Sequence, residues 1–205
     1  MLYSYVVTRD FGFAPNPFGE YCTLATCKPG IRKSASIGDW VIGTGSTEQH
    51  IRMGNHIIYA MQVTEKMSFS QYWLDPKFND KKPVMNGSLK QKYGDNIYYF
   101  DERLNQLVQV NSHHSLDDGS TNEKNYARDT KGLFVLISNN FWYFGEKAPV
   151  IPAEFRDCIK RGMGYKKIND ESTINELIGW LSDNFDKGFN GRPIHFNGKF
   201  IRYKG

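Results

Sequence analysis

The chain has 205 residues, of which 40% are hydrophobic and 15% aromatic, so it holds enough apolar material for a real core. No apolar run reaches the roughly eighteen residues that a membrane-spanning helix needs, and Arg9 and Asp10 come too early for a secretory leader. We therefore expect a cytoplasmic protein with no membrane partner. The formal net charge of +4 is too small to indicate a binder of long duplex nucleic acid, but it permits a phosphate-bearing ligand.

The three cysteines, Cys22, Cys27 and Cys158, are too few and too odd in number for a disulfide framework. No CxxC motif and no paired Cys/His spacing accompanies them, so we predict reduced thiols and no metal site. Cysteine is among the most often buried residue types, and packing is therefore the expected role of Cys22 and Cys27. The sequence indicates no particular cofactor and no oligomeric state.

Four strands are predicted in the first third of the chain. Residues 2–8 are β-branched and aromatic, and residues 21–26 form a second, shorter strand. Between them, residues 9–19 mix Gly, Pro, Asn and three Phe, which is typical of a loop. A Gly-Asp turn leads into an apolar strand at residues 40–46, and residues 56–65 form the next strand.

The middle of the chain is more polar. A capping box of Ser and Gln begins a short helix predicted at residues 68–75. Residues 75–95 are basic and rich in turn formers, and an irregular stretch is expected there. Residues 97–100 and 107–110 would pair as a hairpin of short strands.

The last third combines two predicted hairpins with two helices. An Asn-Asn pair between residues 133–138 and 141–144 predicts a two-residue hairpin, because Asn tolerates the positive φ of such turns. Helices are expected at residues 152–160 and 171–185, the second with apolar residues at helical spacing. An Asn-Gly pair predicts a further hairpin within residues 194–201.

These elements predict an α+β fold, with a mixed, mostly antiparallel β-sheet or a PUA-like β-barrel and helices packed around it. No internal repeat, low-complexity tract or linker divides the sequence. A single domain spanning residues 1–205 is therefore expected, and the C-terminal helices and hairpin at 152–205 belong to it.

Several stretches together resemble the nucleotide modification associated domain 2 family: YVVTRDFGFAPNPF, TLATCKPGIRKSASIGDWVIGTGS, NGSLKQKYGDNIYYFD and SHHSLDDGSTNEKN. The likeness covers about the first 150 residues. It implies a link to phage or bacterial systems that make or handle modified DNA bases, and it carries over no catalytic residue.

The order of strands is also similar to PUA-like domains, including the EVE and YTH branches that read modified bases. In those domains the base lies in a pocket near the ends of comparable strands. By this fold-level likeness, a nucleotide-binding role falls on one set of residues here: Thr8, Arg9, Trp40, Thr44, Gly45 and Ser46.

Residues 111–130 are the densest source of acid, base and hydrogen-bonding groups. His113 and His114 are candidate catalytic residues, because imidazole exchanges protons near neutral pH. If residues 113 and 114 are extended, the two rings face opposite ways and only one faces a pocket. Asp117 and Asp118 would orient an imidazole, or else form an ordinary turn with the following Gly.

Further groups are predicted to contact a nucleotide. Phe11, with other rings, offers a surface on which a base stacks, although core packing explains any single ring as well. Basic side chains suit phosphate, although a solvated charged face is the ordinary alternative. The remaining predicted nucleotide-binding residues are Lys90, Tyr93, Asn122 and Asn125. The GTGS stretch lacks the ending of a P-loop, so ATP hydrolysis is not expected.

Two functions follow from these patterns. The first is a module that binds a modified nucleobase or nucleotide, free or in DNA, in a phage or bacterial modification or defence context. The alternative is an enzyme that acts on a nucleotide or DNA base by His/Asp acid–base chemistry. An adaptor that acts through a protein surface is less favoured, because the sequence has no exposed apolar helix stripe.

Overall fold

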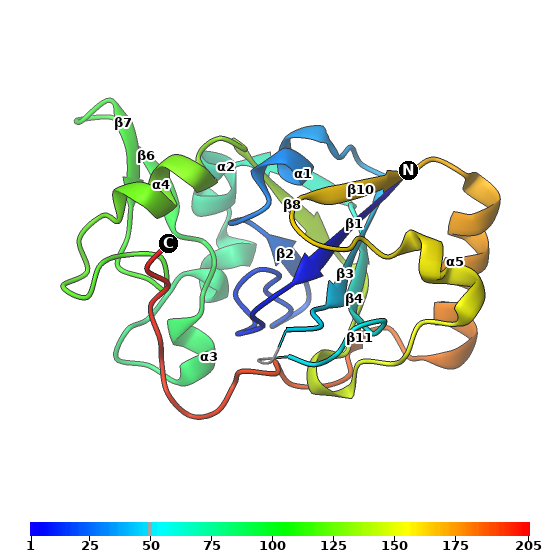
Figure 1. Ribbon diagram of the computed structural model, residues 1–205. Coiled ribbons are helices and arrows are strands. Elements are labelled where there is room, and N and C mark those ends of the chain that lie inside the picture. Colours follow the sequence, from blue (N-terminus) through cyan, green and yellow to red (C-terminus); the bar gives the residue numbers. More distant parts are fainter. Residues whose placement is uncertain (49–50) are drawn as a thin grey trace. The chain divides into compact units, whose positions relative to one another are not determined.

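The computed structural model describes residues 1–48 and 51–205, and the chain divides into two compact units (Figure 1). Unit 1 consists of Met1–Phe11, Ala35–Thr64 and Ser138–His195. Unit 2 consists of Gly12–Ser34, Glu65–Ile137 and Phe196–Gly205. Because each unit takes three separate stretches of chain, the units are not consecutive domains, and the organisation as one domain stays a prediction.

Unit 1 is built on a six-stranded sheet with the order β10-β1-β3-β4-β9-β11. Strand β1, next to the edge strand β10, pairs parallel with β3 and antiparallel with β10. The strands are β1 (Leu2–Val7), β3 (Trp40–Gly45), β4 (Ile57–Gln62), β9 (Asn140–Tyr143), β10 (Tyr165–Ile168) and β11 (Gly188–Phe189). Among the described residues the sheet ends at β10 and β11 without closing. The mixed α+β fold is therefore confirmed, and the PUA-like barrel is not.

The core of unit 1 lies between this sheet and helix α5 (Glu171–Asn184). Ile174, Leu177 and Leu181 recur at helical spacing and pack with Ile42 and Trp142 of the sheet. Two short 3-10 helices, η2 (Gly145–Lys147) and η3 (Ala153–Cys158), complete the unit. Figure 1 shows α5 as the long helix in orange tones.

Unit 2 contains a three-stranded sheet with the order β2-β8-β5 and a two-stranded ribbon of β6 and β7. Short helices surround these strands, and Figure 1 shows α4 beside the ribbon. The strands are β2 (Cys22–Leu24), β5 (Glu65–Ser68), β6 (Tyr98–Asp101), β7 (Gln106–Gln109) and β8 (Phe134–Ser138), whose last residue falls in unit 1. The helices are α1 (Pro29–Ser34), α2 (Phe69–Leu74), η1 (Pro76–Lys81), α3 (Leu89–Lys92) and α4 (Glu123–Asp129).

Most predicted elements are confirmed, including the capping box of α2, the β6–β7 hairpin and helix α5. The predicted hairpin at 133–144 is wrong, because β8 pairs with β5 while β9 pairs with β4 in the other sheet. The Ser138 hydroxyl donates to the Asn140 carbonyl and accepts from its amide, so the Asn pair connects two sheets.

The hairpin predicted at 194–201 is also wrong. Among the described residues this segment contains no strand, although Gly198 has the positive φ that the Asn-Gly pair predicts. The Ile194 amide donates to the Asp10 carboxylate, and the Ile201 amide donates to the Tyr93 hydroxyl. Since both flanking segments form bonds elsewhere, they do not form a ladder with each other.

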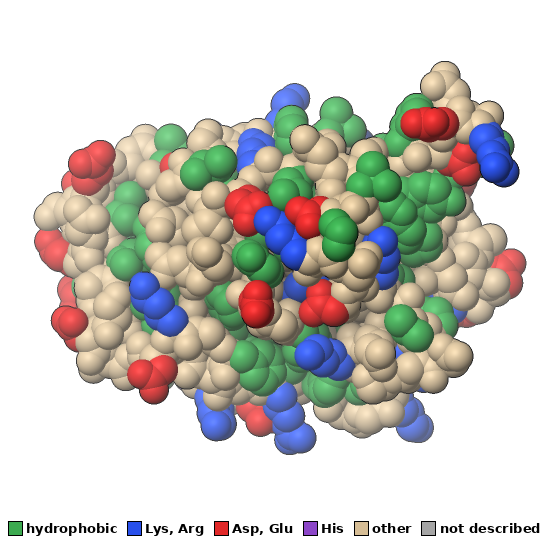
Figure 2. Space-filling model, turned by 180° about the vertical axis from the view of Figure 1, so that it is seen from behind, with side chains coloured by type: hydrophobic (Ala, Val, Ile, Leu, Met, Phe, Trp, Pro, Cys, Tyr) green, Lys and Arg blue, Asp and Glu red, His purple; other side chains and the backbone are tan. Residues whose placement is uncertain are grey.

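Two surface properties bear on function. Within the described part of the chain, no helix is both long enough and apolar enough to cross a membrane. On the face drawn in Figure 2, Lys and Arg side chains are interspersed with Asp and Glu.

Candidate functional site

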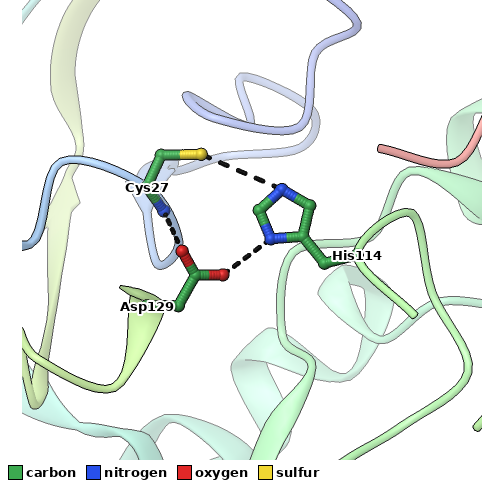
Figure 3. A group of neighbouring side chains, drawn as sticks. All are labelled: Cys27, His114 and Asp129. Carbon is green, nitrogen blue, oxygen red and sulfur yellow. Dashed lines mark hydrogen bonds and ion pairs between the residues drawn. The ribbon is translucent and has the colours of Figure 1, made fainter. Parts of the chain in front are cut away.

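Three side chains of unit 2 form a chain of polar contacts: Cys27, His114 and Asp129 (Figure 3). His114 Nδ1 lies 2.6 Å from Asp129 Oδ2, and His114 Nε2 lies 3.9 Å from Cys27 Sγ. The imidazole therefore stands between a carboxylate and a thiol, with one ring nitrogen toward each. His114 and Asp129 are buried, whereas Cys27 is partly exposed.

Cys27 lies between strand β2 and helix α1 in an unusual backbone conformation. Cys27 has a φ of 55° and Lys28 a φ of 36°, which residues with a side chain rarely adopt. Such conformations cost about 1–3 kcal/mol each and cluster at functional sites. Arg32 supports this turn by donating from Nε to the Cys27 carbonyl at 2.8 Å. A buried guanidinium thus stabilises the strained backbone at Cys27.

Asp129 is the last residue of helix α4, where the helix dipole disfavours a negative charge. Specific donors compensate: the Cys27 amide lies 3.0 Å from Oδ1 and the Tyr98 hydroxyl 3.1 Å from Oδ2. Burial alone would raise the pKa of Asp129, but His114, Arg128 and Arg32 together outweigh it and lower that pKa below its usual value. The carboxylate is therefore held ionised.

His114 is fixed from several sides. Its carbonyl accepts a hydrogen bond from Asn125 Nδ2 at 2.9 Å, and the Phe13 ring lies 4.6 Å from its own. Burial would lower the pKa of His114, yet the Asp129 carboxylate and Cys27 raise it to about 9. The ring is therefore a base strong enough to hold an extra proton at neutral pH.

This arrangement matches the requirements of nucleophilic catalysis by a thiol. A nucleophile, a base within reach of it and a third group that orients the base are the parts of such a site. The 3.9 Å separation of sulfur and nitrogen is longer than a tight hydrogen bond, as is common before substrate binds. The structure therefore holds the parts needed to move a proton between Cys27 and His114.

The same three groups are also of the kinds that ligate a metal, and their ligand atoms lie within 4.8 Å of one another. Using both His114 and Asp129 as ligands would require the 2.6 Å contact between them to open. Using only Sγ and Nε2 gives two protein ligands, fewer than the three of a catalytic zinc. The geometry favours proton transfer over metal binding.

The predicted catalytic residues have different surroundings. His113 is buried among rings, with Phe13 at 4.8 Å and Tyr93 at 5.1 Å, and its Nδ1 contacts the Ile201 carbonyl. Residues 112–115 form a turn instead of an extended strand, so the two imidazoles lie 5.4 Å apart and do not face opposite ways. Of the two, His114 has the carboxylate partner.

Asp117 and Asp118 lie in an exposed turn closed by Gly119, which has a φ of 88°. Asp118 accepts bonds from the Ser120 amide and hydroxyl, which also lowers the pKa of Asp118. Asp117 lies 3.6 Å from Lys204. The carboxylate that contacts His114 is that of Asp129, and the turn explains the Asp-Asp-Gly sequence.

The nucleotide-binding residues predicted in unit 2 are mostly used within the fold. Asn122 caps helix α4, and Asn125 binds the carbonyls of His114 and Tyr203. Tyr93 is buried, and its hydroxyl accepts from the Ile201 amide. Lys90 is exposed, with its ammonium 5.5 Å above the Phe18 ring. Contact with a nucleotide stays a prediction for all four.

The residues predicted in unit 1 fall into two places. Exposed Thr8 and Arg9 follow β1, and Thr44, Gly45 and Ser46 end its parallel neighbour β3, so these five lie together at the carboxyl ends of two strands. Trp40 lies at the opposite end of β3, in the core and stacked on Trp142 at 5.9 Å. Phe11 is buried, 5.2 Å from the His195 ring.

Gly45 has a packing reason of its own. A Cβ at this position would lie 2.3 Å from the Met53 carbonyl oxygen, so only glycine fits. Ser46 is likewise engaged, since its hydroxyl accepts from the Glu48 amide. Gly45 is thus explained by close packing against Met53 and Ser46 by its bond to Glu48, and binding of a ligand there stays a prediction.

Sequence reasoning missed Cys27, Asp129 and Arg32 as parts of one site. The Cys27 thiol was assigned to packing, although one Cys combined with His and Asp elsewhere in a chain is a known signature of a nucleophile. An Asp at the last turn of a helix was the other available signal, because the dipole disfavours it there. The positive φ of Cys27 has no sequence signal.

A family model described as nucleotide modification associated domain 2 matches residues 1–200 of this chain. The match extends beyond the first 150 residues in which the resemblance was recognised, and it includes all three residues of Figure 3. No curated protein and no solved structure matches the chain.

Proposed function

Because the chain belongs to the nucleotide modification associated domain 2 family, we propose that it is an enzyme that acts on a nucleotide or DNA base through Cys27, His114 and Asp129. Cys27 is the nucleophile, His114 carries its proton, and Asp129 orients the imidazole. One observation carries this proposal: the same imidazole lies 2.6 Å from a carboxylate and 3.9 Å from a partly exposed thiol.

The proposed reaction is addition of the Cys27 sulfur to an electrophilic ring carbon of the base. With the proton of the Cys27–His114 pair on His114 Nε2, the Cys27 thiolate adds to the ring carbon, a sulfur–carbon bond forms, and the displaced π electron pair moves to a neighbouring ring carbon that His114 Nε2 then protonates. His114 then removes the hydrogen that this ring carbon carried at the outset, and the returning electron pair breaks the sulfur–carbon bond, so that the net reaction exchanges a ring hydrogen of the base for a solvent proton. Asp129 stays ionised throughout and stabilises the imidazolium.

A module that binds a modified base without changing it is the second candidate. Aromatic rings gather around His113, with Phe13, Tyr93 and Phe200 within 6.3 Å of its ring. Rings of this kind stack on nucleobases. Both candidates share the ligand class, a nucleotide or DNA base, and they differ in whether a product forms.

A panel of unmodified and modified deoxynucleotides and short oligonucleotides separates the two. Mass spectrometry would follow products and also a substrate adduct on the peptide that contains Cys27. Cys27→Ser should abolish turnover, and Asp129→Asn should lower it by about a hundredfold or more, since the imidazole loses its orienting charge. Asp117→Asn is the matched control from the exposed turn and should retain normal turnover.

Alkylation by iodoacetamide gives an independent readout. Among the three cysteines, Cys22 and Cys158 are buried, so Cys27 should be labelled first in the native protein. His114→Gln should slow this labelling at neutral pH, while Cys158→Ala leaves it unchanged. Ligand-dependent stabilisation with neither product nor adduct would support the binding module instead, and equal labelling of native and His114→Gln protein would contradict the proposed role of His114.

A further inference from the structure

The segment between η3 and β10 concentrates the positive charge of the chain. Residues 156–167 contain five Lys or Arg and one Asp, a net charge of +4, which equals the formal net charge of the whole protein. Charges elsewhere in the chain therefore cancel. The mild overall charge therefore conceals a local concentration of basic residues, and the backbone of this segment is coloured in yellow to gold tones in Figure 1.

Four of these basic residues line one pocket of unit 1. Its volume is about 520 Å³, within the range of pockets that hold small ligands. The basic lining consists of Arg156, Lys160, Arg161 and Lys166, accompanied by Tyr165 and Asp157. A concave surface focuses the field of its charges, so this pocket attracts anions more strongly than scattered surface lysines do.

The charge in this pocket is not neutralised by ion pairs. Among the described residues, no carboxylate lies within ion-pair distance of the four basic side chains, in contrast to Lys77 with Glu65 and Arg192 with Glu146. The ammonium groups of Lys160 and Lys166 donate to backbone carbonyls, which positions them without removing their charge. The four basic side chains thus give this pocket a net positive charge.

An exposed apolar side chain stands next to this cluster in the chain. Met163 is 97% exposed, between Gly162 with a φ of 72° and Gly164 with a φ of 84°. Two left-handed glycines give a sharp loop that holds the methionine in solvent. Proteins that bind nucleic acid combine basic residues, which contact phosphates, with apolar side chains inserted between bases.

Lysines on β10 have another possible explanation, because charged residues on an edge strand prevent unwanted strand pairing. That explanation covers Lys166 within the strand. It does not cover Arg156 and Arg161, which lie outside it, and it is at odds with the exposure of Met163. Protection of an edge strand therefore does not explain the basic pocket and the exposed loop, whereas binding of a ligand explains both.

We propose that residues 156–166 bind the phosphate backbone of a polynucleotide, with Met163 in contact with its bases. Arg156 and Arg161 suit this ligand because guanidinium groups bind phosphate oxygens in a bidentate manner. This site goes beyond the function proposed for Cys27, since it identifies a polymer as ligand. A free nucleotide shares the phosphate chemistry but lacks neighbouring phosphates and a base step.

Fluorescence anisotropy with labelled DNA of about 20 nucleotides, single-stranded and duplex, tests this between ~50 and ~300 mM salt. Arg156→Glu/Arg161→Glu should weaken binding at least about tenfold and reduce the salt slope by about 1 to 2. Arg103→Glu/Lys131→Glu makes the same charge change at exposed positions of unit 2 and should keep the native slope. Met163→Ala should weaken binding with an unchanged slope.

Competition identifies the ligand class. A deoxynucleoside triphosphate should displace the labelled DNA only at a concentration far above that of unlabelled oligonucleotide. If the mononucleotide competes as well as the oligonucleotide, the ligand is not a polymer. If both double variants lose the same DNA affinity, the pocket is not the binding site. All of these experiments measure DNA binding, so a negative result would not contradict the enzymatic function proposed for Cys27. Conversely, Cys27→Ser should lose turnover and still bind DNA with native affinity.

Discussion

The interior of unit 1 consists mainly of apolar side chains on a regular sheet, although Asp10 is buried there, whereas the interior of unit 2 also contains buried cations. In unit 1, Leu177 and Trp142 meet with no exposed surface. In unit 2, Arg32 and Lys81 are as completely buried as those apolar groups. The ammonium of Lys81 donates to four oxygens, among them the carbonyls of Phe18 and Tyr21.

The difference shows two ways of holding backbone in place. Paired strands satisfy their own amides and carbonyls, so apolar contact suffices to stabilise them. Unit 2 has long connections and short helices, and its carbonyls at Cys27, Gly132 and Phe134 accept bonds from the single guanidinium of Arg32. In unit 2, buried charged groups bind the backbone carbonyls that strands would otherwise pair. Because Arg32 binds the carbonyls of both Cys27 and Asp129, it also holds these two residues close together.

The largest effect is expected for Arg32→Met. This change leaves several buried carbonyls without a donor and should cost about 3–5 kcal/mol in unfolding free energy. Chemical denaturation measures it. Arg32→Lys keeps the charge but not the planar fork, and should recover only part of the loss. If Arg32→Met lowers the unfolding free energy by less than about 1 kcal/mol, buried charge does not stabilise unit 2 in the way described.

An intermediate effect is expected from pH. Because the pKa of His114 is raised in the folded protein, its protonation stabilises the fold. This contribution to the unfolding free energy is complete below the unfolded pKa of 6.5 and is lost as the pH rises through about 9. The lowered pKa of Asp129 means that its contribution is present above 3.8 and is lost as the pH falls. Unfolding free energy should therefore drop by about 3 kcal/mol between pH 6.5 and 9.

Two variants locate that pH dependence. His114→Gln should flatten the decline above pH 6.5, since the titrating group is gone. Leu177→Ala removes a buried side chain from unit 1 and should cost about 2–5 kcal/mol at every pH, with the native slope. A native slope in His114→Gln would show that the decline arises elsewhere.

The smallest effect is expected at a helix cap. The Ser68 hydroxyl accepts from the Gln71 amide, and the Gln71 side chain accepts from the Ser68 amide. Ser68→Ala should lower the unfolding free energy by about 1 kcal/mol, without pH dependence. Ser88→Ala in the equivalent capping box of the four-residue helix α3 should have a smaller effect. Thermal unfolding of both variants would rank the caps below the buried charges.

The strands and helices of unit 1 were largely predictable, because β-branched runs and the helical spacing of Ile174 and Leu177 are local patterns. The two failed hairpins share a cause. Asn-Asn and Asn-Gly pairs predict turns, but the residues that flank them find partners far away in the chain. Local turn chemistry cannot reveal which distant group competes for an amide.

The site was predictable only in part. His114 was a candidate from its residue type alone, while its neighbour His113 has the same signal and a different environment. The sequence points to Asp117 or Asp118, within four residues of the imidazole, as the orienting carboxylate, whereas the carboxylate that contacts His114 is that of Asp129 at the end of a helix. Cys27 required knowledge of contacts across 87 positions of sequence.

The interleaving of the two units has a consequence for how the protein is made. Synthesis proceeds from the amino terminus, yet unit 1 lacks α5 and β11 until residue 189 has been added, and unit 2 waits for the segment Phe196–Gly205. Neither unit has all of its residues before His195 has been added to the growing chain. Contacts between distant residues also slow folding. Nascent chains of this protein are therefore expected to stay incompletely folded, and open to chaperones, until residues 188–205 have been added.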